Sequence, residues 1–139
     1  MKRIAKCHCG ELSVETEGEP ANVIMCHCEF CQRRTGTSYH LAAWFPSQDV
    51  TIRGELKTYV RTGDRGDKVE FSFCPNCGSN VFLELQESMP DKVGVAVGCF
   101  VEPEFPAPNL SVFGRTRHKW LPMPEGTRSL TGGIGSDPE

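Results

Sequence analysis

The order of hydrophobic and polar residues along this chain predicts short β-strands joined by turns. Polar and apolar residues alternate over residues 11–17, where Leu12 and Val14 share one face, and strictly over residues 69–73. Apolar and β-branched runs predict further strands at residues 50–52, 56–60, 81–85, 93–98 and 110–113. Residues 23–25 form a short apolar run before Cys26, and residues 39–45 form an apolar and aromatic run that ends at Pro46. Because Gly54 separates two of these runs, residues 50–60 are expected to form a hairpin.

Little of the chain favours helix. Residues 29–35 fit one or two helical turns that end at Gly36, whereas residues 1–6 are expected to be a polar lead and residues 62–67 a charged turn. The 10 prolines and 14 glycines suit short strands and turns better than long helices. We therefore expect one mainly β domain over residues 1–139 with short helical turns, and a flexible tail at residues 131–139.

Charge and hydropathy exclude several classes of protein. The formal net charge of -3 argues against a nucleic-acid-binding surface, which is normally basic. No run of about 18 apolar residues is present to cross a membrane. The first six residues are charged and precede no apolar segment of a signal peptide, so we expect a cytoplasmic protein.

The cysteines point to metal binding. Seven of the eight fall into three tight clusters, and without a secretion signal such spacing favours zinc over disulfides. The clusters are Cys7-x-Cys9, Cys26-x-Cys28-x-x-Cys31 and Cys74-Pro75-Asn76-Cys77. The last has the form of a zinc knuckle, in which Pro75 fixes a turn and Gly78 takes a positive φ after the second ligand.

Spacing alone allows two divisions of these sulfurs. In the first, Cys7 and Cys9 join Cys74 and Cys77 in a closed site, which leaves Cys26, Cys28 and Cys31 as a site with three sulfurs. In the second, Cys28 and Cys31 pair with the knuckle, and Cys7, Cys9 and Cys26 form the other site with His8 or His27. Geometry favours the first, because splitting Cys26, Cys28 and Cys31 between metals would bring two ions nearly into contact. Cys99 stands alone after an apolar strand and is expected to pack in the core.

The three cysteine motifs in this order resemble the family of glutathione-dependent formaldehyde-activating enzymes, which includes the centromere protein V domain. The matching stretches are residues 7–10, 26–36 and 73–79, with weaker likeness at Gly98, residues 103–108 and Lys119-Trp120. The likeness covers about residues 4–125. One departure is the stretch 109–113, where members often carry a histidine and this chain has none.

The resemblance implies a zinc-bearing β-fold, the β-tent, with two zinc sites. It implies that Cys7, Cys9, Cys74 and Cys77 hold a structural zinc, and that Cys26, Cys28 and Cys31 hold a catalytic or labile zinc that need not be fully occupied. It further implies a carbon–sulfur lyase that joins glutathione to formaldehyde as S-(hydroxymethyl)glutathione.

A mechanism follows as a hypothesis. Zinc bound by three thiolates has a formal charge of -1 and prefers a soft fourth ligand, such as a thiol, which it would deprotonate. Glutathione carries two carboxylates, and Arg33 and Arg34 directly after the triplet are the nearest cations to bind them. The alternatives are a non-catalytic zinc-binding module and a carbon–sulfur lyase that acts on a different thiol.

Overall fold

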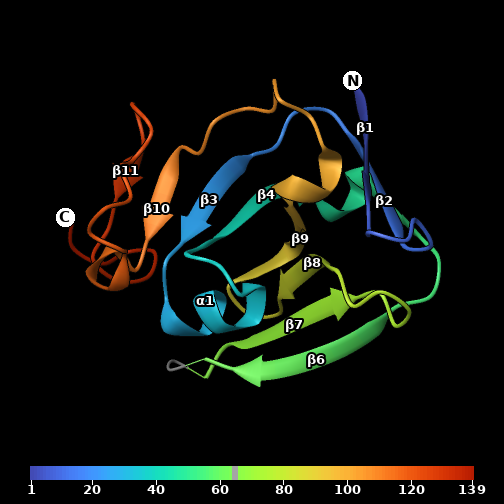
Figure 1. Ribbon diagram of the computed structural model, residues 1–139, viewed down its shortest axis with the longest axis horizontal. Coiled ribbons are helices and arrows are strands. Elements are labelled where there is room, and N and C mark those ends of the chain that lie inside the picture. The colour runs from blue at the N-terminus through green and yellow to red at the C-terminus, as the bar shows by residue number, and fades with distance from the viewer. Residues whose placement is uncertain (64–65) are drawn as a thin grey trace. The chain divides into compact units, whose positions relative to one another are not determined.

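The computed structural model describes residues 1–63 and 66–139 (Figure 1). The chain consists of two compact units. Unit 1 comprises Met1–Ala21 and Ala43–Pro103, and unit 2 comprises Asn22–Ala42 and Glu104–Glu139. The predicted charged turn at residues 62–67 lies partly outside the described residues. Because the chain is mainly β and α1 (Glu29–Thr35) is the one α-helix in the described part, the predicted fold class is confirmed. The division into one domain stays a prediction.

A three-stranded antiparallel sheet in unit 1 contains β1 (Lys2–Lys6), β2 (Ser13–Glu17) and β5 (Val50–Arg53), with β2 in the centre. The expectation of a polar lead at residues 1–6 was wrong, because this segment is β1. Arg3 and Ala5 are its buried residues. The Arg3 guanidinium is tolerated there because it pairs with Glu19 at 2.7 Å and with Glu102 at 2.9 Å.

Four further strands of unit 1 follow one another as antiparallel hairpins, in the order β9-β8-β7-β6. They are β6 (Lys57–Thr62), β7 (Lys68–Phe73), β8 (Asn80–Leu85) and β9 (Met89–Ala96), and Figure 1 shows β6, β7 and β8 side by side. The predicted hairpin over residues 50–60 was wrong. The first half, β5, pairs with β2, and the second half, β6, pairs with β7. Gly54 (φ 101°) lies between them against the backbone of Glu11, so the chain turns away instead of folding back.

β4 (His40–Pro46) begins in unit 2 and ends in unit 1. In unit 1 its Trp44 and Phe45 are buried, and Phe45 contacts Phe100 with ring centroids 6.2 Å apart. Gly94 of β9 leaves room for Trp44, since a Cβ there would lie 2.8 Å from the indole ring. Two 3-10 turns, η1 (Ser47–Asp49) and η2 (Val97–Phe100), complete the regular structure of this unit.

Unit 2 is built around β10 (Leu110–Val112), which pairs in parallel with β3 (Asn22–Cys26) and with β11 (Arg128–Ser129). Val23, Ile24 and Met25 of β3 are buried, as the apolar run predicts. Helix α1 follows β3 and ends at Gly36, whose left-handed backbone (φ 70°) forms the expected C-cap. The remaining element is the 3-10 turn η3 (Gly114–Thr116).

The C-terminal segment makes defined contacts within unit 2. Leu130, just before it, is 2% exposed and bridges to Pro138, while the Glu139 carboxylate pairs with Arg117 at 3.0 Å. Gly114 lies against the Glu139 side chain, because a Cβ there would be 2.7 Å from Oε2. Such contacts restrain a chain end. The flexibility expected for residues 131–139 stays a prediction, which measurements in solution can test.

Candidate metal centres

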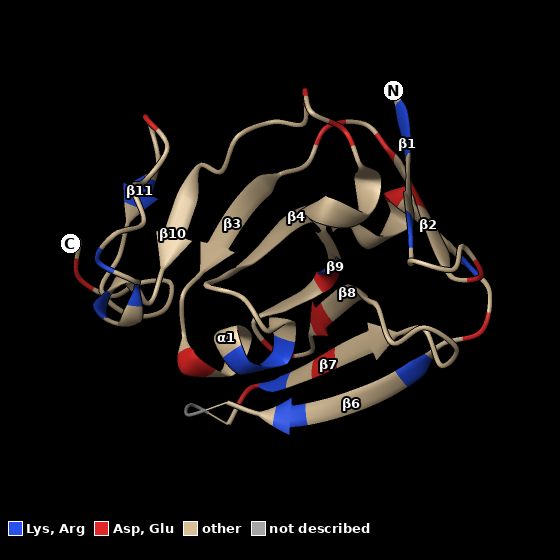
Figure 2. Cartoon of the chain, viewed as in Figure 1, with Lys and Arg blue, Asp and Glu red and all other residues tan. Residues whose placement is uncertain are grey.

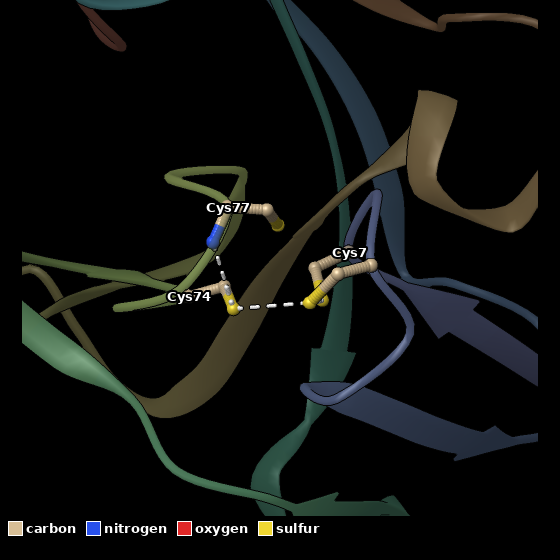
Figure 3. Close-up of side chains that lie close together, drawn as sticks. Cys7, Cys74 and Cys77 are labelled. Atoms are coloured by element: carbon tan, nitrogen blue, oxygen red, sulfur yellow. Dashed lines mark hydrogen bonds between the residues drawn. The ribbon is translucent and has the colours of Figure 1, made fainter.

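Four cysteines of unit 1, which we call the quartet, converge from two loops. Cys7 and Cys9 follow β1, and Cys74 and Cys77 lie between β7 and β8. Their sulfurs all lie within 4.8 Å of one another. Figure 3 shows Cys7 facing Cys74 and Cys77 on the opposite loop. The quartet contains the same four cysteines as the closed site in the first of the two groupings that the spacing allowed.

The sulfur separations fit a tetrahedral metal. The Cys9 Sγ lies 3.6 Å from the Cys7 Sγ and 3.6 Å from the Cys74 Sγ. Zinc–sulfur bonds of about 2.3 Å in a tetrahedron place two sulfurs about 3.8 Å apart. A disulfide would need about 2 Å, and every cysteine is a free thiol. The quartet can therefore hold a metal ion, and its donor set is that of zinc.

Backbone and hydroxyl donors surround the quartet sulfurs. The Leu12 amide donates to Cys7 Sγ at 3.2 Å, and the Cys77 amide to Cys74 Sγ at 3.5 Å. The pKa of Cys77 is lowered to about 5, chiefly by its side-chain hydrogen bond with Ser79. Gly78 has the predicted positive φ of 77°, and its amide donates to the Cys74 carbonyl at 2.8 Å. These donors stabilise thiolates, the form that binds a metal.

Three cysteines of unit 2, the triplet, lie where β3 passes into α1. Cys26 ends β3, Cys28 is the N-cap of α1, and Cys31 lies in its first turn. Their sulfurs also lie within 4.8 Å of one another, and the Cys31 amide donates to Cys28 Sγ at 3.3 Å. In the described parts of the chain, no histidine, carboxylate or further cysteine completes this group at that spacing. The triplet thus offers three ligands.

The protonation of the triplet indicates that it needs a cation. Hydrogen bonds with Cys26 and then Cys31 lower the pKa of Cys28, while the same contact with Cys28 raises the pKa of Cys26 far above its usual range. One thiolate in the triplet is therefore favourable, whereas ionisation of a second cysteine is strongly opposed. Three adjacent thiolates become stable only when a positive ion compensates them, so the donor set fits a soft metal such as zinc.

His27, between two triplet cysteines, holds the segment in place. Its ring is fully buried, and Nε2 lies 3.0 Å from the Ser111 hydroxyl on β10. Its backbone oxygen accepts from Thr116 Oγ1 at 2.8 Å and from Gln32 Nε2 at 2.9 Å. Burial, followed by the Arg117 charge, lowers the pKa of His27, which keeps the ring neutral. The sequence did not reveal this role, because Ser111 is 84 positions away.

The two arginines predicted to bind substrate differ in their surroundings. Figure 2 shows basic residues on the C-terminal half of α1. Arg33 is 72% exposed and lies 3.7 Å from Glu29, whereas Arg34 is partly buried. The Arg34 charge acts to lower the pKa of Cys31, which places it close to the triplet. Of the pair, Arg34 is therefore better placed to act at this site.

A histidine that the sequence did not single out lies in the same neighbourhood. His40 is 8% exposed, and burial and then the Arg34 charge lower its pKa to about 3. The Cys28 charge acts in the opposite direction and favours a higher pKa for His40. Trp120, in the weakly matching Lys119-Trp120 stretch, is 69% exposed, and its ring contacts the His118 ring with centroids 5.1 Å apart.

Cys99 departs from its expected place in the core. It is partly exposed, its Sγ lies 3.7 Å from the Asn80 carbonyl oxygen, and burial raises the pKa of its thiol. It lines a half-open pocket of about 530 Å³ in unit 1 together with Cys7, Ser79 and Phe100. Cys99 belongs to neither cysteine group.

The sequence matches a known protein family. The sequence profile described as "Glutathione-dependent formaldehyde-activating enzyme" matches residues 2–116, which include every cysteine of both groups. The chain belongs to this family. The match confirms the resemblance seen in the motifs.

A solved structure is also similar. The crystal structure of a Rhodobacter sphaeroides protein, a structural-genomics target, shares 31% sequence identity with a TM-score of 0.56. The alignment covers 72% of this chain and 91% of that one. In the described residues, no helix combines the length and apolar character required to cross a membrane.

Proposed function

We propose that this protein is a zinc-dependent carbon–sulfur lyase-type enzyme that forms or cleaves a thiol–aldehyde adduct, similar to S-(hydroxymethyl)glutathione synthase. The observation that carries the proposal is the separation of the cysteines into a group of four and a group of three. Closed four-cysteine sites are typical of structural zinc, whereas a catalytic zinc keeps one position for water or substrate. Membership in the family supports the same activity.

In this proposal Cys26, Cys28 and Cys31 hold the catalytic zinc, and Cys7, Cys9, Cys74 and Cys77 hold the structural one. A zinc ion held by these three cysteines would supply the charge that lowers the pKa of a bound substrate thiol. The chain keeps its three sulfurs together through the N-cap position of Cys28 and the hydrogen bond between His27 and Ser111. Preorganised ligands cost little to assemble on binding.

The thiol would be glutathione or a related small molecule. Glutathione carries two carboxylates, and guanidinium groups bind carboxylates through paired hydrogen bonds. Arg34 is the favoured partner because its charge already acts at the triplet, and Arg33 is the second candidate. The net charge of -3 makes such local cations important for attracting an anionic substrate.

The proposal is tested by NMR detection of adduct formation. Zinc-loaded protein is mixed with a panel of thiols and aldehydes, and exchange between free and adduct signals is measured. Cys28→Ser should abolish the acceleration, whereas Cys99→Ser, a matched change outside both groups, should retain it. Turnover that survives in Cys28→Ser refutes the placement of the site. Turnover on thiols other than glutathione would assign a different substrate, and none on any thiol would indicate a non-catalytic zinc module.

A further inference from the structure

His40 has a buried nitrogen with no hydrogen-bond partner in the described structure. It is the first residue of β4 and belongs to unit 2, as does the triplet. The side chain is 8% exposed, and its Nε2 atom is fully buried without a partner. Most buried polar atoms in proteins are hydrogen-bonded, so an exception needs an explanation such as a bound ligand or a functional role.

The surroundings of the ring point toward the triplet. The two charged groups that act on His40 are the Arg34 guanidinium and the Cys28 thiolate, both at α1. The Arg34 charge acts on Cys31 as well. The strand order agrees, because β4 lies next to β3, and Cys26 is the last residue of β3. The Tyr39 ring, one residue before His40, contacts the ring of His27 between the triplet cysteines, with centroids 5.7 Å apart. His40 is not a member of the metal-ligand group, so its Nε2 atom is not assigned to the metal.

We propose that His40 is a catalytic residue whose Nε2–H donates a hydrogen bond to the aldehyde oxygen of the substrate. This inference rests on the proposed function. When a thiol adds to an aldehyde, a carbon–sulfur bond forms, the C=O π bond breaks, and the thiol proton ends on the former carbonyl oxygen. Negative charge develops on that oxygen during the addition, and a fixed donor in a buried site stabilises it. A neutral imidazole can donate from Nε2 in one tautomer.

The test compares His40→Phe, which removes the donor, with His40→Gln, whose side-chain amide can supply one near the same position. Cys99→Ser, outside both cysteine groups, is the control. We expect His40→Phe to lower kcat/KM for formaldehyde about 10²–10³-fold, the usual loss of an oxyanion donor. The KM for the thiol and the zinc content should stay unchanged. His40→Gln should keep kcat/KM within about tenfold, and Cys99→Ser should match the wild type.

A second readout does not depend on turnover. The ring ¹⁵N resonances of His40, assigned by their loss in His40→Gln, should shift when thiol and formaldehyde are added together, and should not shift with thiol alone. This measurement on the wild type also covers the case in which His40→Phe does not fold.

Three results would overturn the inference. One is an active wild type whose kcat/KM is unaffected by His40→Phe, another is loss of zinc in that variant, and the third is the absence of a ¹⁵N shift. A wild type that is inactive toward every thiol and aldehyde would instead refute the proposed function itself.

Discussion

Gly54 supports the quartet through a close backbone approach. It lies between β5 and β6 with φ at 101°, in the region that disfavours residues with a Cβ. A Cβ there would overlap the Glu11 carbonyl oxygen and lie 3.0 Å from its carbonyl carbon and 3.2 Å from Leu12 Cα. These are backbone atoms, which cannot rotate away as a flexible side chain could. Gly54→Ala should therefore displace the loop that carries Cys7 and Cys9.

The magnitude follows from what this displacement breaks. The positive φ costs an alanine about 1–2 kcal/mol. The loop also holds the hydrogen bonds from the Cys7 amide to the Leu12 oxygen at 3.0 Å and from the Leu12 amide to Cys7 Sγ at 3.2 Å. Each contributes about 1 kcal/mol, so the total loss is about 3–4 kcal/mol. At roughly 3–4 °C per kcal/mol for a chain of this size, Tm should fall by roughly 10–15 °C.

Thermal unfolding followed by circular dichroism, with zinc retention measured against a competing chelator, tests this reasoning. Gly18→Ala is the matched control, because Gly18 also has a positive φ of 80° but nothing within 4 Å of a Cβ. It should lose only about 1–2 kcal/mol and keep its zinc affinity. If Gly54→Ala and Gly18→Ala are equally stable and bind zinc equally well, the contact does not support the quartet.

Three further predictions concern the core, the acid response and the substrate cations. Gly94→Ala should lose about 1–3 kcal/mol in denaturant unfolding, because its Cβ would lie 2.8 Å from the Trp44 ring; an unchanged midpoint would contradict this packing. The folded pKa of His40, about 3, lies below its unfolded value of 6.5, so the unfolded chain binds more protons between these pH values and stability rises with pH there. At pH 5 this costs about 2 kcal/mol relative to neutral pH, a difference that His40→Phe should remove from unfolding curves of the metal-free protein. Arg34→Ala should raise the KM for glutathione about tenfold and the exposed Arg33→Ala less than about twofold in steady-state kinetics, and equal effects would refute the assignment.

The elements that rest on local pattern could be predicted from the sequence. The alternating runs became β2 and β7, and the Gly36 stop ended α1, because local periodicity and caps decide such segments. The close spacing within each cysteine motif likewise predicts metal binding, but spacing alone allowed two divisions of the sulfurs into sites. The pairing of the strands was harder to predict from the sequence. The β5–β2 pairing depends on a close approach at Gly54 that leaves no signal in neighbouring residues.

The features that could not be predicted depend on residues that are distant in the sequence or belong to no recognisable motif. β1 was missed because Arg3 reads as a solvated charge, and only Glu19 and Glu102 make its burial acceptable. The hydrogen bond that holds His27 in place could not be predicted, because its partner Ser111 belongs to another strand. His40 lies at the start of an apolar run and has no metal-ligand spacing, so only its burial and unpartnered nitrogen draw attention to it.

The proposed function requires that a metal bound by the triplet keeps a position open for a substrate thiol. Cobalt(II) can replace zinc in both groups, and its absorption reports the number of bound thiolates. Addition of a small thiol to the cobalt-loaded protein should increase the sulfur-to-cobalt charge-transfer band by one thiolate in the wild type and should leave Cys28→Ser unchanged. A wild-type spectrum that does not respond to thiol would contradict the account, because it would show that no position at the triplet metal is open to a thiol.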